Sequence, residues 1–110
     1  MTPRSPLHEI RNWCDLARIS CYQAAKLAKA CRVSDRTLRR FFHDELLTSL
    51  RVWLERRRIN DAKKKLQRGV IRVKQAAREA GYAHSEHFSR SFKALCGISP
   101  KEWMATRRAV

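Results

Sequence analysis

The side chains best suited to chemistry are a group of arginines between residues 34 and 42. Leu38, Phe41 and Phe42 are spaced i, i+3, i+4, which predicts that they share the buried face of a helix. The face that remains carries three guanidinium groups: Arg36, Arg39 and Arg40. A guanidinium is a planar fork of N–H donors that matches phosphate oxygens and the O6/N7 edge of guanine. This face therefore suits the binding of a polyanion.

Acid–base and metal chemistry have weaker support. Two short runs mix imidazole with carboxylate or thiol groups: His43-Asp44-Glu45, and His84, Glu86 and His87 upstream of Cys96. The two histidines of the second run are three residues apart, whereas zinc enzymes with the HExxH pattern place them four apart. No Ser-His-Asp order or glycine-rich phosphate loop stands out. We expect no enzyme, no catalytic residue, no metal site and no cofactor; a metal sensor built from the second run is a minor alternative.

The four cysteines show neither a CxxC pair nor a zinc-finger spacing. They are Cys14, Cys21, Cys31 and Cys96. We expect all four in helices among apolar neighbours, where cysteine acts as a small buried hydrophobe. Unpaired cysteines indicate, weakly, a reducing cytoplasm.

The charge balance supports a polyanionic partner. The chain has 110 residues, with 25 Lys plus Arg against 10 Asp plus Glu and a formal net charge of +15. Such a protein attracts polyanions over about 8 Å at physiological salt. DNA, RNA and anionic membranes all qualify, and a basic footprint of this size is typical of nucleic-acid binders. The apolar fraction of 44% is ordinary for a folded domain.

No segment reads as a membrane span or a secretory signal. A span needs about 20 consecutive apolar residues, and the N-terminus lacks an apolar h-region. Residues 49–68 are basic and amphipathic, so a membrane-surface helix is an alternative, but Asp61 argues against it. We expect no membrane partner and a location in the bacterial cytoplasm, associated with the nucleoid.

One short pattern occurs twice in the chain. Ala28 matches Ala77 and Val33 matches Tyr82; after one extra residue in the second turn, Leu38, Arg40 and Phe42 match Phe88, Arg90 and Phe92. Each copy has a small residue where two helices approach, a short turn, and an amphipathic second helix. This is the organisation of a helix-turn-helix.

The chain is expected to be all-α, with about seven helices and two helix-turn-helix subdomains. The expected helices begin at Ser5-Pro6, Ser20, Ser34, Ser49, Val73, Ser85 and Ser99-Pro100. In the second helix the expected buried set is Tyr22, Ala25, Leu27 and Ala28. Glycines end several elements: Gly69 and Gly97 as helix caps, and Gly81 in a turn that needs a positive φ.

The helix from Ser49 to about Arg68 is the longest and would connect two halves. We place the first half at residues 6–47, the connecting helix at 48–68 and the second half at 69–108. Twenty residues span roughly 30 Å, close to the ~34 Å between successive major-groove faces of B-DNA. The connecting helix could therefore hold two reading heads at groove spacing.

The C-terminal half resembles the signature of AraC/XylS-type transcription regulators. The matching elements are Gly81-Tyr82, Phe88-Ser89-Arg90-x-Phe92-Lys93, Gly97-x-Ser99-Pro100 and Trp103. The first half agrees through Val33-Ser34, Leu38, Arg40, Phe42, Trp53-Leu54, Arg58-Ile59 and Ala62. The resemblance covers roughly residues 7–108. It implies that residues 1–110 form an AraC-type DNA-binding domain, either a single-domain, MarA-like regulator or the reader of a longer protein.

The resemblance also implies how DNA would be bound. Two successive major-groove segments would be read by helices near 35–45 and 85–95, on an asymmetric site and with the chain as a monomer. The base-reading positions carried over are Arg36, Arg39 and Arg40 in the first half, and Ser85, Glu86, His87, Ser89 and Arg90 in the second. For Arg40 and Arg90, a structural ion pair to a neighbouring helix is the alternative. The partners would be double-stranded promoter DNA and RNA polymerase, as an activator or a repressor.

Several positions in the first half depart from the family pattern. Arg32 stands where the turn usually has Gly, and Leu47 and Leu50 replace a common Gly and Pro. Arg57 stands where an apolar residue is more usual. We expect an altered turn and an altered entry to the long helix.

The chief alternative function is non-specific binding, as a nucleoid or RNA-binding protein. Single-strand binders present exposed aromatic platforms, whereas the four phenylalanines here are at core spacing: Phe41, Phe42, Phe88 and Phe92. A weak sequence preference in a binding assay would favour this alternative.

Overall fold

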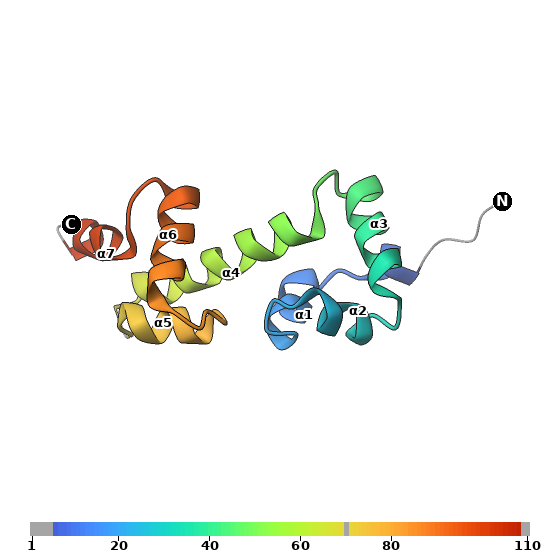
Figure 1. Ribbon diagram of the computed structural model, residues 1–110, viewed down its shortest axis with the longest axis horizontal. Helices are drawn as coiled ribbons and strands as arrows, with labels where there is room; N and C mark the ends of the chain where they lie inside the picture. The colour runs from blue at the N-terminus through green and yellow to red at the C-terminus, as the bar shows by residue number, and fades with distance from the viewer. Residues whose placement is uncertain (1–5, 70, 109–110) are drawn as a thin grey trace. The chain divides into compact units, whose positions relative to one another are not determined.

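The computed structural model describes residues 6–69 and 71–108, and within these ranges every regular element is a helix. A short 3-10 helix, η1 (Pro6–Glu9), comes first (Figure 1). The α-helices are α1 (Trp13–Ile19), α2 (Ala24–Ala30), α3 (Asp35–Glu45), α4 (Leu50–Gln67), α5 (Val73–Glu79), α6 (Ser85–Cys96) and α7 (Pro100–Arg108). The all-α prediction with seven helices is confirmed. No helix in the described ranges is long and apolar enough to cross a membrane.

The chain divides into two compact units, Met1–Glu55 and Arg56–Val110. The division falls inside α4, so this helix contributes its first residues to one unit and the rest to the other. The first unit contains η1 and α1–α3, and the second contains α5–α7.

The core of the first unit is built from aliphatic residues around an aromatic cluster. Its buried members are Leu7, Ala17, Tyr22, Leu27, Ala28, Leu38, Phe42, Leu50 and Leu54. The Phe42 ring is fully buried and lies 5.1 Å, centroid to centroid, from both Trp13 and Trp53. Edge-on ring pairs at this distance add to the stabilisation from burial alone.

The core of the second unit combines three alanines with two fully buried phenylalanines. Its buried members are Ile59, Ala62, Leu66, Ala76, Ala77, Ala80, Phe88 and Phe92. The small side chains of Ala76 and Ala77 let the backbone of α5 approach α6 closely, as the sequence predicted for this position. Tyr82, Trp103 and Met104 pack around the edge of this core.

Three of the predicted serine caps are confirmed by hydrogen bonds. The Ser34 hydroxyl accepts from the Thr37 amide, that of Ser49 from Val52, and that of Ser99 from Glu102, each at 3.1 Å. Each bond satisfies an amide at the start of a helix that has no partner within the helix. The predicted helix starts at these serines are correct.

The start of the second helix was predicted wrongly. Ser20 does not open α2: it is a buried residue directly after α1, and α2 begins at Ala24. Cys21 and Tyr22 both have a positive φ, and the Tyr22 amide donates to the Ala17 carbonyl at 2.8 Å. Burial of the Tyr22 ring closes this turn, so the helix cannot continue through it.

Two further predictions, one for α2 and one for the N-terminus, are also wrong. Ala25 is exposed, and the neighbouring Ala24 is half-buried and packs against the core instead. At the N-terminus, Pro6–Glu9 forms a 3-10 helix and α1 begins at Trp13, so one continuous helix from the start is not formed. The predicted cap Ser5 lies outside the described residues.

The cysteines are less buried than predicted. Cys14 and Cys21 are exposed, while Cys31 and Cys96 are half-buried. Cys21 and Cys31 occupy the turns after α1 and α2 rather than helix interiors. Burial raises the pKa of the Cys31 thiol, because the apolar surroundings disfavour the thiolate.

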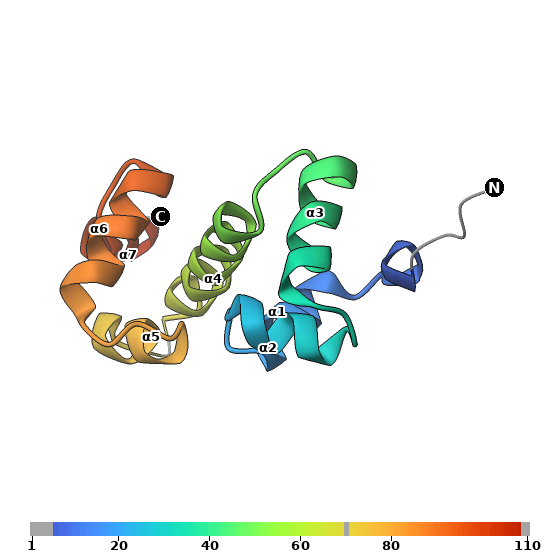
Figure 2. The ribbon, with the colours of Figure 1, turned by 45° about the vertical axis from the view of Figure 1, so that its right-hand side comes forward.

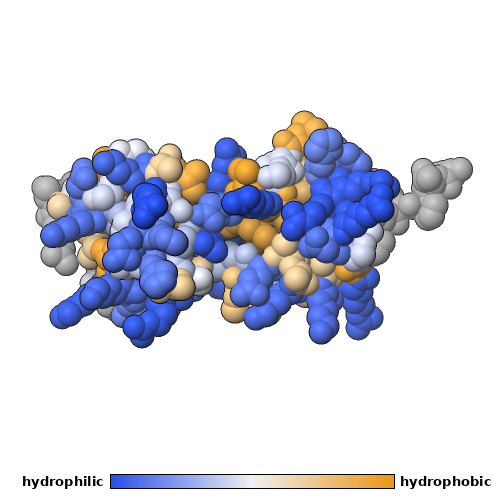
Figure 3. Space-filling model, viewed as in Figure 1, coloured by the Kyte–Doolittle hydropathy of each residue, from blue (hydrophilic) through white to orange (hydrophobic). Residues whose placement is uncertain are grey.

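Two of the departures from the family pattern fall at positions where the backbone has a positive φ. Arg32 and Leu47 have φ of +59° and +53°, the left-handed conformation that favours glycine. Hydrophobic atoms reach the surface at the α3–α4 junction (Figure 3), where Leu47 is 86% exposed. Both turns therefore hold a residue with a Cβ in a conformation that is strained for it.

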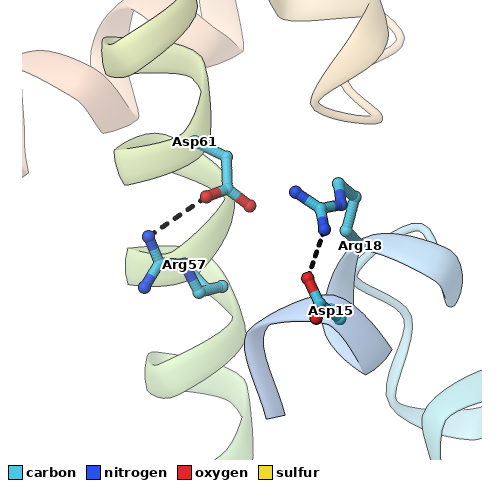
Figure 4. A network of polar contacts seen from close by, with 4 residues as sticks. All are labelled: Asp15, Arg18, Arg57 and Asp61. Atoms are coloured by element: carbon cyan, nitrogen blue, oxygen red, sulfur yellow. Dashed lines mark hydrogen bonds and ion pairs between the residues drawn. The ribbon is translucent and has the colours of Figure 1, made fainter. Parts of the chain in front are cut away.

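Arg57, at the position where an apolar residue is more usual, is accommodated by an ion pair. It lies partly buried on α4, and its Nη2 donates to Asp61 Oδ1 at 3.1 Å, one helical turn away (Figure 4). In the first unit, Arg18 forms a similar ion pair with Asp15, three residues away in α1, but both of these side chains are exposed. Pairing offsets the desolvation of the half-buried Arg57 charge.

Candidate nucleic-acid interface

The duplicated pattern corresponds to two turns with matching hydrogen bonds. In the first unit the Val33 amide donates to the Ala28 carbonyl at 3.1 Å, and in the second the Tyr82 amide donates to the Ala77 carbonyl at 3.0 Å. The residue before each donor has a positive φ: Arg32 at +59° and Gly81 at +90°. The matches inferred from the sequence are therefore equivalent positions in the two turns.

Each turn connects a pair of packed helices. In the first unit α2 packs against α3, and in the second α5 packs against α6. In both pairs the first helix lies across the N-terminal end of the second (Figure 2). This is the helix-turn-helix arrangement, in which the N-terminal residues of the second helix contact base edges.

In the first unit, α3 exposes its arginines as the sequence predicts. Leu38 and Phe42 are fully buried, and the opposite face presents Arg36, Arg39 and Arg40 to solvent. Arg39 Nε donates to Asp35 Oδ2 at 2.6 Å, but both side chains are about half exposed. Such a surface pair is worth at most about 1 kcal/mol, so Arg39 can exchange Asp35 for another anion.

In the second unit, α6 has the same division of faces. Phe88 and Phe92 are fully buried, and the remaining face carries the predicted Ser85, Glu86, His87, Ser89 and Arg90. The two serines are half-buried, and the other three side chains are exposed. Within the described part of the chain, neither Arg40 nor Arg90 pairs with a carboxylate, so the alternative role of a structural ion pair finds no partner for either.

Two hollows flank the first turns of α6. One, of about 460 Å³, is lined by residues of α5, of the turn and of the start of α6, among them Lys74, Arg78, Tyr82, His84, Ser85 and Glu86. The other, of about 370 Å³, is lined by Ser85, Glu86, Ser89, Arg90, Lys93 and Ser99. Of the predicted reading residues, Ser85 and Glu86 line both hollows, and Ser89 and Arg90 line the second.

These hollows add residues that the sequence reasoning missed. Lys74 and Arg78 are exposed and four residues apart on α5, on the side away from the buried pair Ala76 and Ala77. That spacing was visible in the sequence and could have identified a basic edge. His84 precedes α6, and its ring lies 5.7 Å from that of His87.

On the face drawn in Figure 3, hydrophilic residues predominate around both helix pairs, with smaller hydrophobic areas among them. Positive charge is divided unevenly: residues 1–55 contain 10 Lys plus Arg and 6 Asp plus Glu, and residues 56–110 contain 15 and 4. The second unit therefore exerts the stronger attraction on a polyanion.

Metal binding has no assembled site in the part of the chain that the structure describes. No group of three or more His, Cys, Asp or Glu side chains there could hold an ion. His84 and His87 lie near each other, but they are not joined by Cys96 in such a group.

A family model described as a helix-turn-helix domain matches residues 27–106, which is most of the chain. A search of curated protein sequences found no match.

Among solved structures, a transcriptional regulator with an AraC-type DNA-binding domain from Chromobacterium violaceum is 26% identical in sequence. The match covers 84% of this chain and 86% of that one, with a TM-score of 0.75. A DNA-binding transcriptional dual regulator from Escherichia coli K-12 is 20% identical over 88% of this chain and 89% of its own, with a TM-score of 0.79. The C-terminal domain of AraT, a response regulator from Geobacillus stearothermophilus, is 24% identical over 87% and 86%, with a TM-score of 0.71. The last two establish the fold.

The helix pairs, their exposed polar or basic faces and the family match agree. The chain belongs to the AraC-type helix-turn-helix family, the DNA-binding domain of transcriptional regulators.

Proposed function

We propose that this protein is a sequence-specific reader of double-stranded DNA that places α3 and α6 in two successive major-groove segments. The observation that carries the proposal is the duplicated helix-turn-helix, in which each second helix buries two apolar residues and exposes polar or basic ones on the opposite face. Specific binding needs such side chains at base edges in addition to charge.

The side chains of α3 suit a site that contains guanine. Arg36 and Arg40 are exposed and unpaired with any described carboxylate, so each can donate two hydrogen bonds to guanine O6 and N7. A good bidentate contact is worth about 1–3 kcal/mol of discrimination against the wrong base. Arg39 would first have to leave Asp35.

The side chains of α6 offer a more varied set of contacts. Arg90 suits guanine, Glu86 can accept from cytosine N4, and the hydroxyls of Ser85 and Ser89 suit several bases. His87 completes the exposed set in the first turn of the helix. We call the DNA segments read by α3 and by α6 the first and the second box. Base discrimination in the second box is assigned to these five residues.

Phosphate contacts would come from the edges of the hollows beside α6. Lys74 and Arg78 on one side, and Lys93 and Ser99 on the other, surround the reading residues. Such contacts fix the register of the protein on DNA without reading sequence. Bound in this way as a monomer in the cytoplasm, the domain would recruit or exclude RNA polymerase and would carry out no catalysis.

The test is selection of bound duplexes from a random pool of about 30 base pairs at about 150 mM salt, where non-specific binding is weak. We expect two short motifs in a fixed order and spacing. Absence of any enriched motif would contradict specific reading and favour non-specific nucleic-acid binding, for which the net charge of +15 would suffice.

A further inference from the structure

The Tyr82 ring contacts a cation and an aromatic ring at once. Tyr82 lies in the turn between α5 and α6, directly after Gly81. The guanidinium carbon of Arg58, on α4, lies 3.6 Å from the centroid of the Tyr82 ring. The Phe88 ring meets Tyr82 edge-on, with the centroids 5.4 Å apart. Three elements of the second unit therefore meet at this one side chain.

Phe88 connects this contact to the reading face of α6. Its ring is fully buried, and its neighbours in the chain are His87 and Ser89, two of the proposed reading residues. Because the directions of side chains on one helix are fixed relative to one another, the position of Phe88 in the core determines where His87 and Ser89 point. Tyr82 also lines the larger hollow with Ser85 and Glu86.

We propose that Arg58 is a positioning residue for base reading by α6, acting through Tyr82. Arg58 need not touch DNA: its guanidinium holds the Tyr82 ring, and that ring fixes the turn and the start of α6. The proposal rests on the function proposed above, since it presupposes that α6 reads bases.

The contact is specific to the second unit. The position equivalent to Tyr82 in the first turn is Val33, which has no ring for a cation to stack on. The loss of the Arg58 contact should therefore disturb reading by α6 and leave reading by α3 unchanged. This asymmetry separates a positioning role from a general loss of stability, which would weaken both boxes together.

The experiment compares the base preferences of the full chain and its variants in the random-pool selection. Arg58→Met keeps the aliphatic stem and removes the cation. We expect it to lower discrimination by about two- to thirtyfold in one box, the box that Arg90→Ala also affects, with the other box unchanged. Arg58→Lys retains a cation and should keep most of the preference.

Lys63→Met is the matched control. The Lys63 ammonium lies 4.4 Å from the centroid of the Trp103 ring, a contact of the same type from the same helix but away from the turn. It should leave the preferences of both boxes unchanged. Thermal unfolding followed by circular dichroism checks that every variant is folded at the assay temperature.

Equal losses in both boxes, or no change in either, would overturn the positioning role. If Arg58→Met does not fold, the pair Tyr82→Phe and Tyr82→Leu decides: the first keeps the ring face and should keep the preferences, and the second should lose those of one box. If the wild-type chain enriches no motif, the proposed function itself is wrong, and the positioning role with it. That outcome is distinct from a wild-type motif that Arg58→Met leaves intact.

Discussion

Leu47 combines two features that are unfavourable in a single residue. Its φ of +53° is left-handed, and its side chain is 86% exposed. Glycine adopts this conformation without a Cβ clash, and little burial is lost with an exposed leucine. We expect Leu47→Gly to raise the free energy of unfolding by roughly 0.5–1 kcal/mol, measured by urea denaturation followed by circular dichroism.

Gly97 provides the opposite test at the same scale. Its φ is +84°, and a Cβ added there would meet no atom within 4 Å, so the cost of a side chain is conformational. Gly97→Ala should therefore lower the free energy of unfolding by about 1 kcal/mol. If both substitutions shift the stability in the same direction, left-handed strain does not govern these two turns.

Arg90 and Lys64 are both exposed cations, but they occupy different surfaces. Arg90 lies on the proposed reading face of α6 and lines a hollow, and Lys64 lies on α4. We expect Arg90→Ala to weaken specific binding about 5- to 100-fold, the range that loss of a base contact gives, and Lys64→Ala to weaken it less. The measurement is a titration of the selected duplex at matched salt; equal losses for the two variants would argue against base reading by Arg90.

At the scale of the element, a serine before an amphipathic run predicted three helix starts correctly and one wrongly. Ser34, Ser49 and Ser99 each stand before an amphipathic run, and each caps its helix as expected. Ser20 is also a serine before a run with buried apolar residues, but it lies directly after α1 and does not begin α2. What distinguishes Ser20 is the burial of the neighbouring Tyr22 ring in the core, a tertiary contact that no local pattern contains.

The cap of α3 gives a prediction for this scale. Ser34→Ala removes the acceptor for the Thr37 amide and should cost about 1 kcal/mol of stability. Because Arg36 lies in the first turn of α3, fraying of that turn should also weaken discrimination in the box that α3 reads. Ser99→Ala removes an equivalent cap from α7 and serves as the control. It should cost similar stability while leaving that box unchanged.

At the scale of the molecule, the repeat made the all-α fold and both helix-turn-helix pairs predictable. Ala28 with Val33, and Ala77 with Tyr82, identify the two turns, because in each turn the amide of the second residue donates to the carbonyl of the first. The edges of the interface were not predictable in the same way. Lys74 and Ser99 become neighbours of the proposed reading residues through the packing of α5 and α7 against α6, which their positions in the chain alone do not specify. Lys93, by contrast, lies one turn after Ser89 and Arg90 on α6 itself.

The two units also differ in charge, and this difference can be used to ask whether both engage DNA. Lys29 and Arg78 are equivalent residues, 49 apart in the sequence as Ala28 and Ala77 are, and both are exposed in the last turn of the first helix of a pair. Each phosphate contact that is removed lowers the slope of log K against log salt by about 1. We expect Lys29→Gln and Arg78→Gln each to lower the slope by about that amount, and the double variant by about 2.

Titration of the selected duplex between about 50 and 200 mM salt gives these slopes. A drop for Arg78→Gln alone would mean that Arg78 contacts a phosphate and Lys29 does not, and would count against equivalent docking of the two helix pairs. Additive drops would mean that both units lie on the duplex at once. A residue that makes no phosphate contact releases no counterions on binding, so its substitution would leave the slope unchanged.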